Sequence, residues 1–186
     1  MNPTLSLLRV SALSLALLSS SVVAADTGAG ASAGAAQATA ISGRYTSAAT
    51  DAEKKVRQKS VDVTVKEFPA NVQPIAADKL DVKTHIPSWI EIKQAGGKVT
   101  FHFEGRQPEV CPLSGSAKGK DPEGNDATFE ARASGDTLVQ TITTEEGKRV
   151  NTIKVQPDGS LKLSVELSSI KFKTPIRYTL SFAKGK

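Results

Sequence analysis

The closing part of the chain, Ala127 to Phe182, alternates apolar and polar residues with a period of two. This period predicts β-strands, and the short Gly-containing breaks between them predict an antiparallel meander. The clearest strand runs from Leu161 to Leu167, where every second residue is Leu or Val. Each predicted strand is apolar on one face only, so together they would form a sheet with one apolar side. An up-and-down barrel would close that sheet and remove its edges; the alternative is an open, curled sheet that holds a helix against its apolar face.

Turn lengths test this pattern, because residues that pair directly across an antiparallel hairpin lie on the same face of the sheet. Gly-Gly suits a two-residue turn, and Pro-Asp-Gly suits a three-residue loop with Gly in the left-handed position. The predicted pairs are Ile92 with Phe101 and Ile90 with Phe103 across Gly96-Gly97, Ala131 with Gln140 and Phe129 with Ile142 across Ser134–Thr137, Leu138 with Val155, Gln140 with Ile153 and Ile142 with Asn151 across Glu145–Lys148, and Val155 with Leu161 across Pro157–Gly159.

A helical period precedes most of the sheet. Thr50 and Glu53 form a capping box, which satisfies the free amides at a helix start. An amphipathic helix is predicted over Asp51 to Phe68; its second half also alternates, which leaves a strand there as the alternative. Pro69 would end this helix, and a second short helix is predicted from Gln73 or Pro74 to Val82. The apolar positions of the first helix are Val56, Val61, Val65 and Phe68.

Three segments of the sheet are less regular. Arg106–Leu113 contains two prolines, which suit an edge strand or a broken strand. Ser114–Asp126 is rich in Gly, Ser and charge, so a loop is predicted there. Ile170 and Phe172 fall on the opposite parity from the strand before them, which predicts a bulge or bend near Ser168-Ser169.

The N-terminus has the layout of a secretory signal peptide. Arg9 is followed by the apolar stretch Val10–Val23 and then by small residues. We therefore predict a signal peptide over residues 1–25 and an exported protein, periplasmic or extracellular, with no membrane segment after cleavage. Residues 26–40 are almost entirely Gly, Ala, Ser, Thr and Gln, which predicts a flexible leader. One β-barrel-like domain over 41–186, with a helical insert at about 50–83, is expected to follow.

Composition narrows the choice of partner. The chain of 186 residues has 24 Lys and Arg against 19 Asp and Glu, a formal net charge of +5, and only 5% aromatic residues. Nucleic-acid binding calls for a basic stripe and stacking aromatics, whereas these charges are interspersed along the chain. Solvated strand faces explain them, so no nucleic-acid partner is predicted.

The residues that could carry chemistry form no recognisable catalytic set. His85, His102 and Cys111 lack metal-motif spacing, and the carboxylates of the loop Asp121–Asp126 lack the Gly position of a calcium loop. There is no nucleophile elbow and no phosphate-binding Gly-rich loop. We predict no enzyme, no cofactor and no metal, and we expect the single Cys111 to be a small buried hydrophobe.

The layout from Ile41 to Phe182 resembles the calycin superfamily of lipocalins and fatty-acid-binding proteins. Gly43-Arg44-Tyr45 stands where lipocalins favour a Gly-x-Trp strand, and a helical pair followed by a meander is similar to the fatty-acid-binding branch. The resemblance implies a closed barrel that holds a lipophilic ligand. It departs from that branch in the last strand, where Arg177 and Tyr178 are adjacent and face opposite ways in place of the Arg-x-Tyr used for a carboxylate.

Gln140, Asn151 and Tyr178 are polar residues on the otherwise apolar face. They would either bond to one another or to water in a packed core, or orient the polar end of an apolar ligand. We therefore predict an exported binding protein for a small hydrophobic molecule held in the lumen. The alternative is a ligand-free, envelope-associated interaction or structural module that acts through its surface. The residues predicted to form the walls of the ligand site are Phe101, Phe103, Phe129, Ile142, Leu163, Val165 and Leu180.

Overall fold

The computed structural model describes residues 41–185, and their strands form one ten-stranded antiparallel sheet. The predicted signal peptide (1–25) and leader (26–40) lie outside the described residues. The elements in chain order are β1 (Gly43–Ser47), α2 (Asp51–Val65), α3 (Gln73–Lys83), β2 (Trp89–Ala95), β3 (Lys98–Phe103), β4 (Glu109–Pro112), β5 (Ala117–Lys120), β6 (Asp126–Ser134), β7 (Thr137–Thr144), β8 (Gly147–Val155), β9 (Leu161–Ser169) and β10 (Phe172–Lys184).

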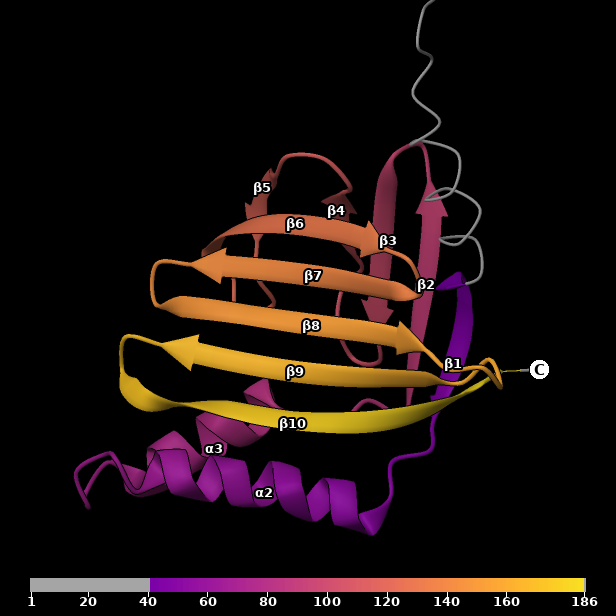
Figure 1. Ribbon diagram of the computed structural model, residues 1–186. Helices are drawn as coiled ribbons and strands as arrows, with labels where there is room; N and C mark the ends of the chain where they lie inside the picture. Colours follow the sequence, from indigo (N-terminus) through magenta and orange to yellow (C-terminus); the bar gives the residue numbers. More distant parts are fainter. Residues whose placement is uncertain (1–40, 186) are drawn as a thin grey trace, which may run out of the picture.

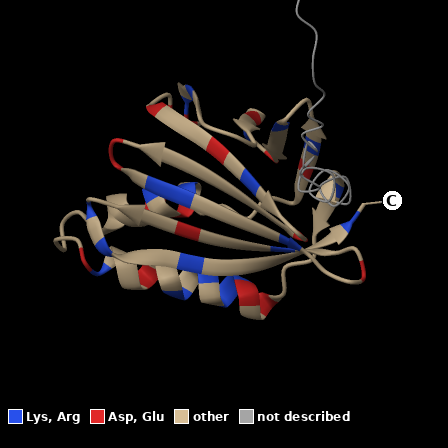
Figure 2. Cartoon of the chain, turned by 45° about the horizontal axis from the view of Figure 1, so that its top comes forward, with Lys and Arg blue, Asp and Glu red and all other residues tan. Residues whose placement is uncertain are grey.

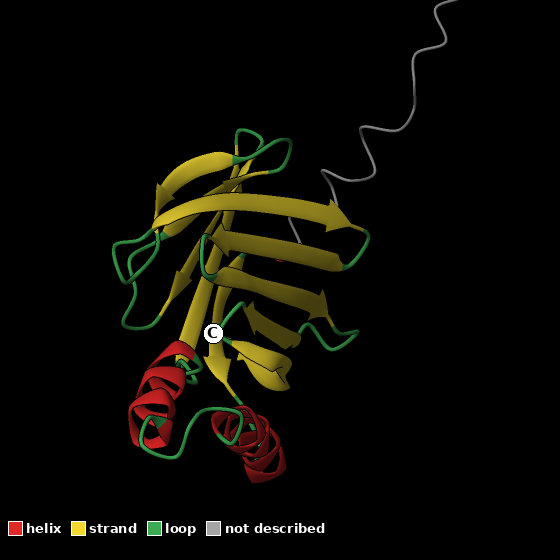
Figure 3. Ribbon diagram, turned by 90° about the vertical axis from the view of Figure 1, so that its left-hand side faces the viewer, coloured by secondary structure: helices red, strands yellow, loops and turns green. Residues whose placement is uncertain are grey.

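The sheet curls into a nearly closed barrel. β1 pairs with both β2 and β10, so the strand order is β4-β3-β2-β1-β10-β9-β8-β7-β6-β5 and the two edge strands are β4 and β5. Strands β1 to β3 cross the direction of β6 to β10, and α2 and α3 lie together at one end of the barrel (Figures 1 and 3). The predicted fold class is confirmed: a mainly β, antiparallel, calycin-like meander with a helical pair after the first strand.

Most of the predicted hairpin registers are confirmed. Ile92 pairs with Phe101 across Gly96-Gly97, as predicted. Two more predicted pairs, Phe129 with Ile142 and Val155 with Leu161, are also present. The loop before Thr137 is shorter than predicted, because Ser134 and Thr137 themselves pair; this change leaves the register unaltered.

The predicted register of β7 on β8 is wrong. The turn contains only Glu145 and Glu146, with Thr144 paired to Gly147, so Gln140 lies opposite Asn151 and not opposite Ile153. The two registers differ by two residues, and such a shift leaves every side chain on the same face, so the apolar pattern could not separate them. Gly147, the first residue of β8, has no room for a side chain, because a Cβ there would lie 2.2 Å from the backbone oxygen of Ser168 on β9.

The segment predicted as a loop, Ser114–Asp126, contains the short edge strand β5. β5 pairs with β6, from Ala117 opposite Phe129 to Lys120 opposite Asp126. Its sequence has no apolar alternation because it is short and mostly exposed. The other edge strand, β4, confirms the expectation of an edge strand within Arg106–Leu113.

The predicted irregularity near Ser168-Ser169 lies in the following strand instead. The β9–β10 register shifts between Phe172 and Ile176, while β9 continues to Ser169. Pro175 lies in this stretch, and proline is found at strand irregularities because it cannot donate a ladder hydrogen bond. Ile170, whose position is out of phase with the apolar positions of β9, lies in the turn before β10, with 81% of its surface exposed.

Helix α2 begins as predicted. The Thr50 hydroxyl accepts from the Glu53 amide at 3.2 Å, and the Glu53 carboxylate accepts from the Thr50 amide at 2.9 Å. The second half of α2 is helical and not a strand, although the helix ends at Val65, before Phe68. Val56 was predicted on the packed face and is 55% exposed; the position next to it, Arg57, is buried instead because its guanidinium reaches α3.

Helix α2 covers the edge of β10 that β1 leaves unpaired, since β1 pairs only with the last residues of β10. Ser60 Oγ accepts from the Arg177 amide at 2.9 Å, and Glu67 accepts from the Thr174 amide at 3.0 Å. Thr64 Oγ1 donates to the Thr174 carbonyl at 3.2 Å. These side chains take the place of a neighbouring strand, which protects an edge that could otherwise pair with another chain.

Candidate functional site

The interior of the barrel is apolar over most of its surface. The residues predicted as walls are all buried, each with at most 6% of its surface exposed, and they come from β3, β6, β7, β9 and β10. They belong to one cluster with other buried side chains, among them Tyr45 and Phe182. The predicted wall residues that the structure places in this cluster are Phe101, Phe103, Phe129, Ile142, Leu163, Val165 and Leu180.

A chain of polar side chains crosses this apolar interior. Asn151 Nδ2 donates to Gln140 Oε1 at 2.7 Å, and Gln140 Nε2 donates to Glu109 Oε2 at 2.7 Å. Gln140 and Asn151 are almost wholly inaccessible to solvent. The structure therefore brings these two predicted residues together. Tyr178 lies apart from them, and its hydroxyl donates to the Thr84 carbonyl at 3.4 Å.

Glu109 was not predicted as a site residue. It is 7% exposed, and its Oε1 has no hydrogen-bond partner among the described residues. Burial raises the pKa of the Glu109 carboxyl, opposed by the hydrogen bond from Gln140 and by the charges of Arg149 and Arg106. Glu109 lies two residues before Cys111 in a short strand, and its shared parity with that expected buried residue is the one sequence signal that would have placed it on the inner face.

Arg106 and Arg149 bring two guanidinium groups to the same end of the interior, and both were missed. Arg149 Nε donates to Asn151 Oδ1 at 3.0 Å, and its Nη1 donates to the Lys83 carbonyl at 2.9 Å. Arg106 Nη2 donates to the same carbonyl at 3.3 Å. Burial and the nearby charge of Arg149 lower the pKa of Arg106. Arg149 lies two residues before Asn151 in the same strand, so both side chains are on the inner face. This spacing is the sequence signal that would have identified Arg149 as a site residue.

Neither of these guanidiniums is neutralised by an ion pair. Within residues 41–185, no carboxylate lies within 4.0 Å of a nitrogen of Arg106 or Arg149, in contrast to Arg177, whose Nε is 3.0 Å from Glu166 on the outer face. Both side chains are half-buried. An unpaired, partly desolvated positive charge favours an anionic partner.

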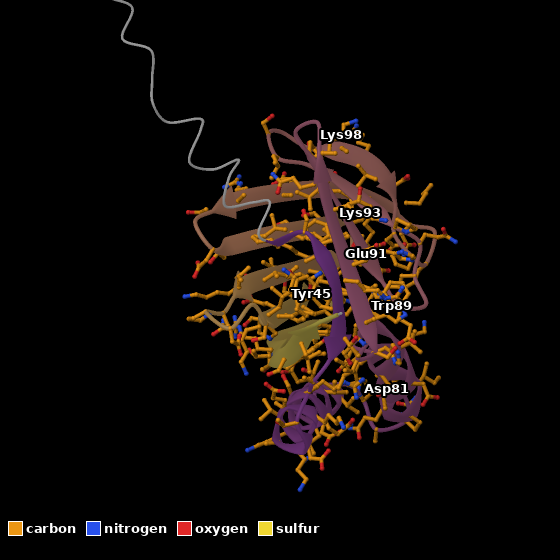
Figure 4. All side chains as sticks on the ribbon, turned by 90° about the vertical axis from the view of Figure 1, so that its right-hand side faces the viewer. Tyr45, Asp81, Trp89, Glu91, Lys93 and Lys98 are labelled. Atoms are coloured by element: carbon orange, nitrogen blue, oxygen red, sulfur yellow. The ribbon has the colours of Figure 1, made fainter. Side chains whose placement is uncertain are left out.

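Backbone carbonyls at the C-terminus of α3 accept hydrogen bonds from Arg106 and Arg149, and also from a third arginine, Arg57. Arg57 Nε donates to the Thr84 carbonyl at 3.1 Å, and its Nη2 donates to the Asp81 carbonyl at 2.9 Å. Arg57 Nη2 also lies 2.6 Å from the Asp81 carboxylate. The last carbonyls of a helix carry partial negative charge, so cations are favourable there. Figure 4 shows Asp81 in the helical layer below the strands.

Cys111 lies inside the barrel as the expected buried hydrophobe, with no exposed surface. Its Sγ is 3.7 Å from Gln140 Nε2. Burial raises the pKa of the thiol to about 11. The group is therefore a thiol at neutral pH, and thiols react far less readily than thiolates.

The histidines do not contribute to the interior. His85 is exposed, and His102 packs edge-on against Trp89 with ring centroids 4.8 Å apart. The Arg44 guanidinium lies 4.1 Å from the centre of the Trp89 ring, on the side of the barrel shown in Figure 4. No cluster of three or more His, Cys, Asp or Glu suited to a metal ion occurs in the part of the chain that the structure describes.

The outer surface carries mixed charge and a groove beside α2. Figure 2 shows Lys and Arg interspersed with Asp and Glu along α2 and the strands. The groove, of about 550 Å³, lies between α2 and strands β8 to β10 and includes Val56, Val150 and Arg177. Of the predicted ligand residues, only Val165 and Tyr178 contribute to it. Between residues 41 and 185, no helix combines the length and apolar character needed to cross a membrane.

Comparison with solved structures shows a calycin-like fold. The chain is similar to a secretory abundant heat soluble protein from Ramazzottius varieornatus, with 11% identity, a TM-score of 0.51, and coverage of 78% of this chain and 96% of that one. It is also similar to fatty-acid-binding protein 1 of Echinococcus granulosus (13% identity, TM-score 0.50, 80% and 99% coverage). A third similar structure is a Schistosoma mansoni fatty acid binding protein in complex with arachidonic acid (14%, 0.50, 81% and 99%). No protein-family model and no curated protein matches the chain.

Proposed function

We propose that this barrel binds a small lipophilic molecule with an acidic group, the apolar part against the inner walls and the acid beside Arg106 and Arg149. The observation that carries the proposal is the pair of half-buried guanidiniums without a carboxylate partner within 4.0 Å. Guanidinium groups bind carboxylates through charge-assisted hydrogen bonds, which are stronger than bonds to neutral acceptors. Two structural neighbours are fatty-acid-binding proteins by name, which supports the same ligand class.

The apolar walls would supply most of the binding free energy. Each buried methylene contributes about 0.8 kcal/mol, so a chain of ten methylenes would gain roughly 8 kcal/mol before the cost of association is deducted. The acid group would add specificity: it fixes which end of the ligand enters first. Tyr178 lies at the same end of the barrel, where its hydroxyl donates to the Thr84 carbonyl.

Native mass spectrometry of the chain from Asp26 onwards would test this proposal. The protein is mixed with dodecanoate or with dodecanol, two ligands of equal chain length that differ only in the acid. We expect one dodecanoate per chain, bound about tenfold more tightly than dodecanol. A protein that takes up neither ligand, and that also fails to bind a fluorescent apolar probe, would overturn the proposal.

Arg149→Gln removes one guanidinium and should abolish most of the preference for dodecanoate over dodecanol. The matched control is Arg177→Gln on the outer face, where the guanidinium is paired with Glu166. It should leave the preference unchanged, although it removes the same charge from the protein. Equal losses of preference in both variants would show that overall charge, and not the interior position, selects the acid.

Export of the protein remains part of the proposal. The predicted signal peptide over residues 1–25 supports it. Intact-mass measurement on protein recovered outside the cytoplasm should give a chain that begins at or near Asp26. Recovery of the full-length chain only, from the cytoplasm, would contradict export without affecting ligand binding.

A ligand-free module is the second candidate function. The hydrogen bond from Asn151 to Gln140 favours it, because the remaining groups of these two interior amides are also bonded within the protein, to Glu109 and Arg149. In that case the barrel would be filled by its own side chains and would act through its surface. Absence of any uptake in the mass-spectrometric experiment, together with a crystal structure whose interior is packed, would favour this candidate.

A further inference from the structure

Four polar side chains form a directed chain of hydrogen bonds in the barrel interior. Arg149 Nε donates to Asn151 Oδ1 at 3.0 Å, and Asn151 Nδ2 donates to Gln140 Oε1 at 2.7 Å. Gln140 Nε2 then donates to Glu109 Oε2 at 2.7 Å. Every bond is donated in the same direction, from the guanidinium toward the carboxyl, and bonds aligned in this way polarise one another. The chain therefore links a positive group on β8 to a carboxyl on β4.

Glu109 ends this chain with one oxygen unused. Its Oε1 is buried and has no hydrogen-bond partner within residues 41–185. Burial favours the uncharged form of a carboxyl group, because an ionised carboxylate loses its hydration there. Since Oε2 already accepts from Gln140, the proton of the uncharged form is placed on Oε1.

The charges that act on Glu109 come from three other parts of the chain. Arg149 of β8 and Arg106 of the segment before β4 favour its ionised form, whereas Asp121 of the loop after β5 favours its protonated form. The Cys111 thiol on the same strand has its pKa raised to about 11 by burial and is uncharged at neutral pH. The inner-face residues of β3, β6 and β7 are uncharged. The two arginines are therefore the groups that keep Glu109 from being protonated more readily.

We propose that the barrel binds the ligand's acid group together with a proton, which Glu109 takes from solvent on Oε1. The inference rests on the proposed function, because it needs an acid group beside Arg106 and Arg149. Hydrogen bonds within the described residues use two of the three guanidinium nitrogens of Arg149 and one of those of Arg106. Donors thus remain for the acid, and no contact of either arginine has to be broken.

The bound acid strengthens the hold of Glu109 on a proton in two ways. A carboxylate beside Arg106 and Arg149 offsets the positive charge that stabilises ionised Glu109. The two carboxylates would also repel each other, and like charges in one poorly solvated site disfavour joint ionisation. By reciprocity, protonation of Glu109 raises the affinity for the acid. Affinity is therefore highest where Glu109 is protonated in the free protein, and it falls as pH rises through the pKa of that group.

Isothermal titration calorimetry on the chain from Asp26 counts the protons directly. Dodecanoate is titrated at one pH in two buffers with different enthalpies of ionisation, and the difference in heat gives the protons taken up per ligand. The pair of titrations is repeated from about pH 6, where a free carboxylic acid is already ionised, to about pH 9. We expect uptake of at least about 0.3 proton per dodecanoate within this range, and a fall in affinity of about tenfold across it. Smaller uptake throughout, while dodecanoate binds, would overturn the inference and leave the proposed function standing.

Glu109→Gln keeps the size of the side chain but cannot take up the proton. This variant should bind dodecanoate without proton uptake and with an affinity that does not change with pH. The matched control is Glu166→Gln on the outer face, where the carboxylate pairs with Arg177, and it should keep the uptake of the unaltered protein. Uptake that persists in Glu109→Gln would assign the proton to another group and overturn the role of Glu109.

Dodecanol provides a comparison that does not depend on the folding of any variant. It lacks the acid, so the unaltered protein should bind it without proton uptake. Equal uptake with dodecanol and dodecanoate would show that the proton follows burial of the apolar chain, which would overturn the inference. Failure of the unaltered protein to bind dodecanoate at any pH would overturn the proposed function itself.

Discussion

Gln140→Ala tests whether the interior polar chain is a dry, structural feature. The Gln140 side chain accepts from Asn151 and donates to Glu109, both at 2.7 Å. A neutral hydrogen bond contributes about 0.5–1.5 kcal/mol and one to a charged group about 1.5–3 kcal/mol. Truncation would remove both bonds and leave two buried polar groups unpaired, so we expect a loss of about 3 kcal/mol in the free energy of unfolding.

Urea unfolding of the chain from Asp26, followed by two independent probes, measures this loss, and coincident transitions confirm that the comparison is two-state. For a protein of this size, about 3 kcal/mol corresponds to a fall in Tm of roughly 6–12 °C. Thr143→Ala, an exposed position on the same strand, is the control and should change stability by less than about 0.5 kcal/mol. A loss below about 1 kcal/mol for Gln140→Ala would refute the reasoning, because water inside the barrel would then be replacing the amide.

Three further predictions concern single groups. Burial raises the pKa of Glu109 in the folded state, so its contribution to stability is fully present below the unfolded pKa and is lost as pH rises through the folded pKa. Glu109→Gln should therefore make the free energy of unfolding, measured in urea from acid to neutral pH, depend less on pH. An unaltered pH profile would contradict this prediction. Cys111, with a thiol pKa of about 11, should resist a thiol reagent at pH 8 until urea unfolds the protein; rapid labelling of the native state would count against its burial. Gly147→Ala would place a Cβ 2.2 Å from the Ser168 oxygen and should cost about 1–3 kcal/mol of stability in urea unfolding. An unchanged stability would disprove the close approach of β8 to β9.

The amino-acid sequence alone determined the features that depend on neighbouring residues. Period-two alternation identified the main strands, and turn chemistry placed Ile92 opposite Phe101. The capping box at Thr50 located the start of α2. Each of these signals lies within a short window, where side-chain parity and backbone preference act directly. The inward faces followed from parity, and so did the burial of the predicted wall residues.

Only the tertiary structure decided how the polar interior is assembled. The shift of two residues that places Gln140 opposite Asn151 leaves every side chain on the same face, so the alternation of apolar and polar residues is equally compatible with either register. Glu109 and Arg106 lie in irregular sequence around an edge strand, and their approach to Arg149 depends on closure of the barrel. The junction of Arg57 with Thr84 joins two helices that are each defined locally but are packed by long-range contacts. Local pattern fixes which way a side chain faces; which distant group it meets depends on how the sheet curls and where the helices lie.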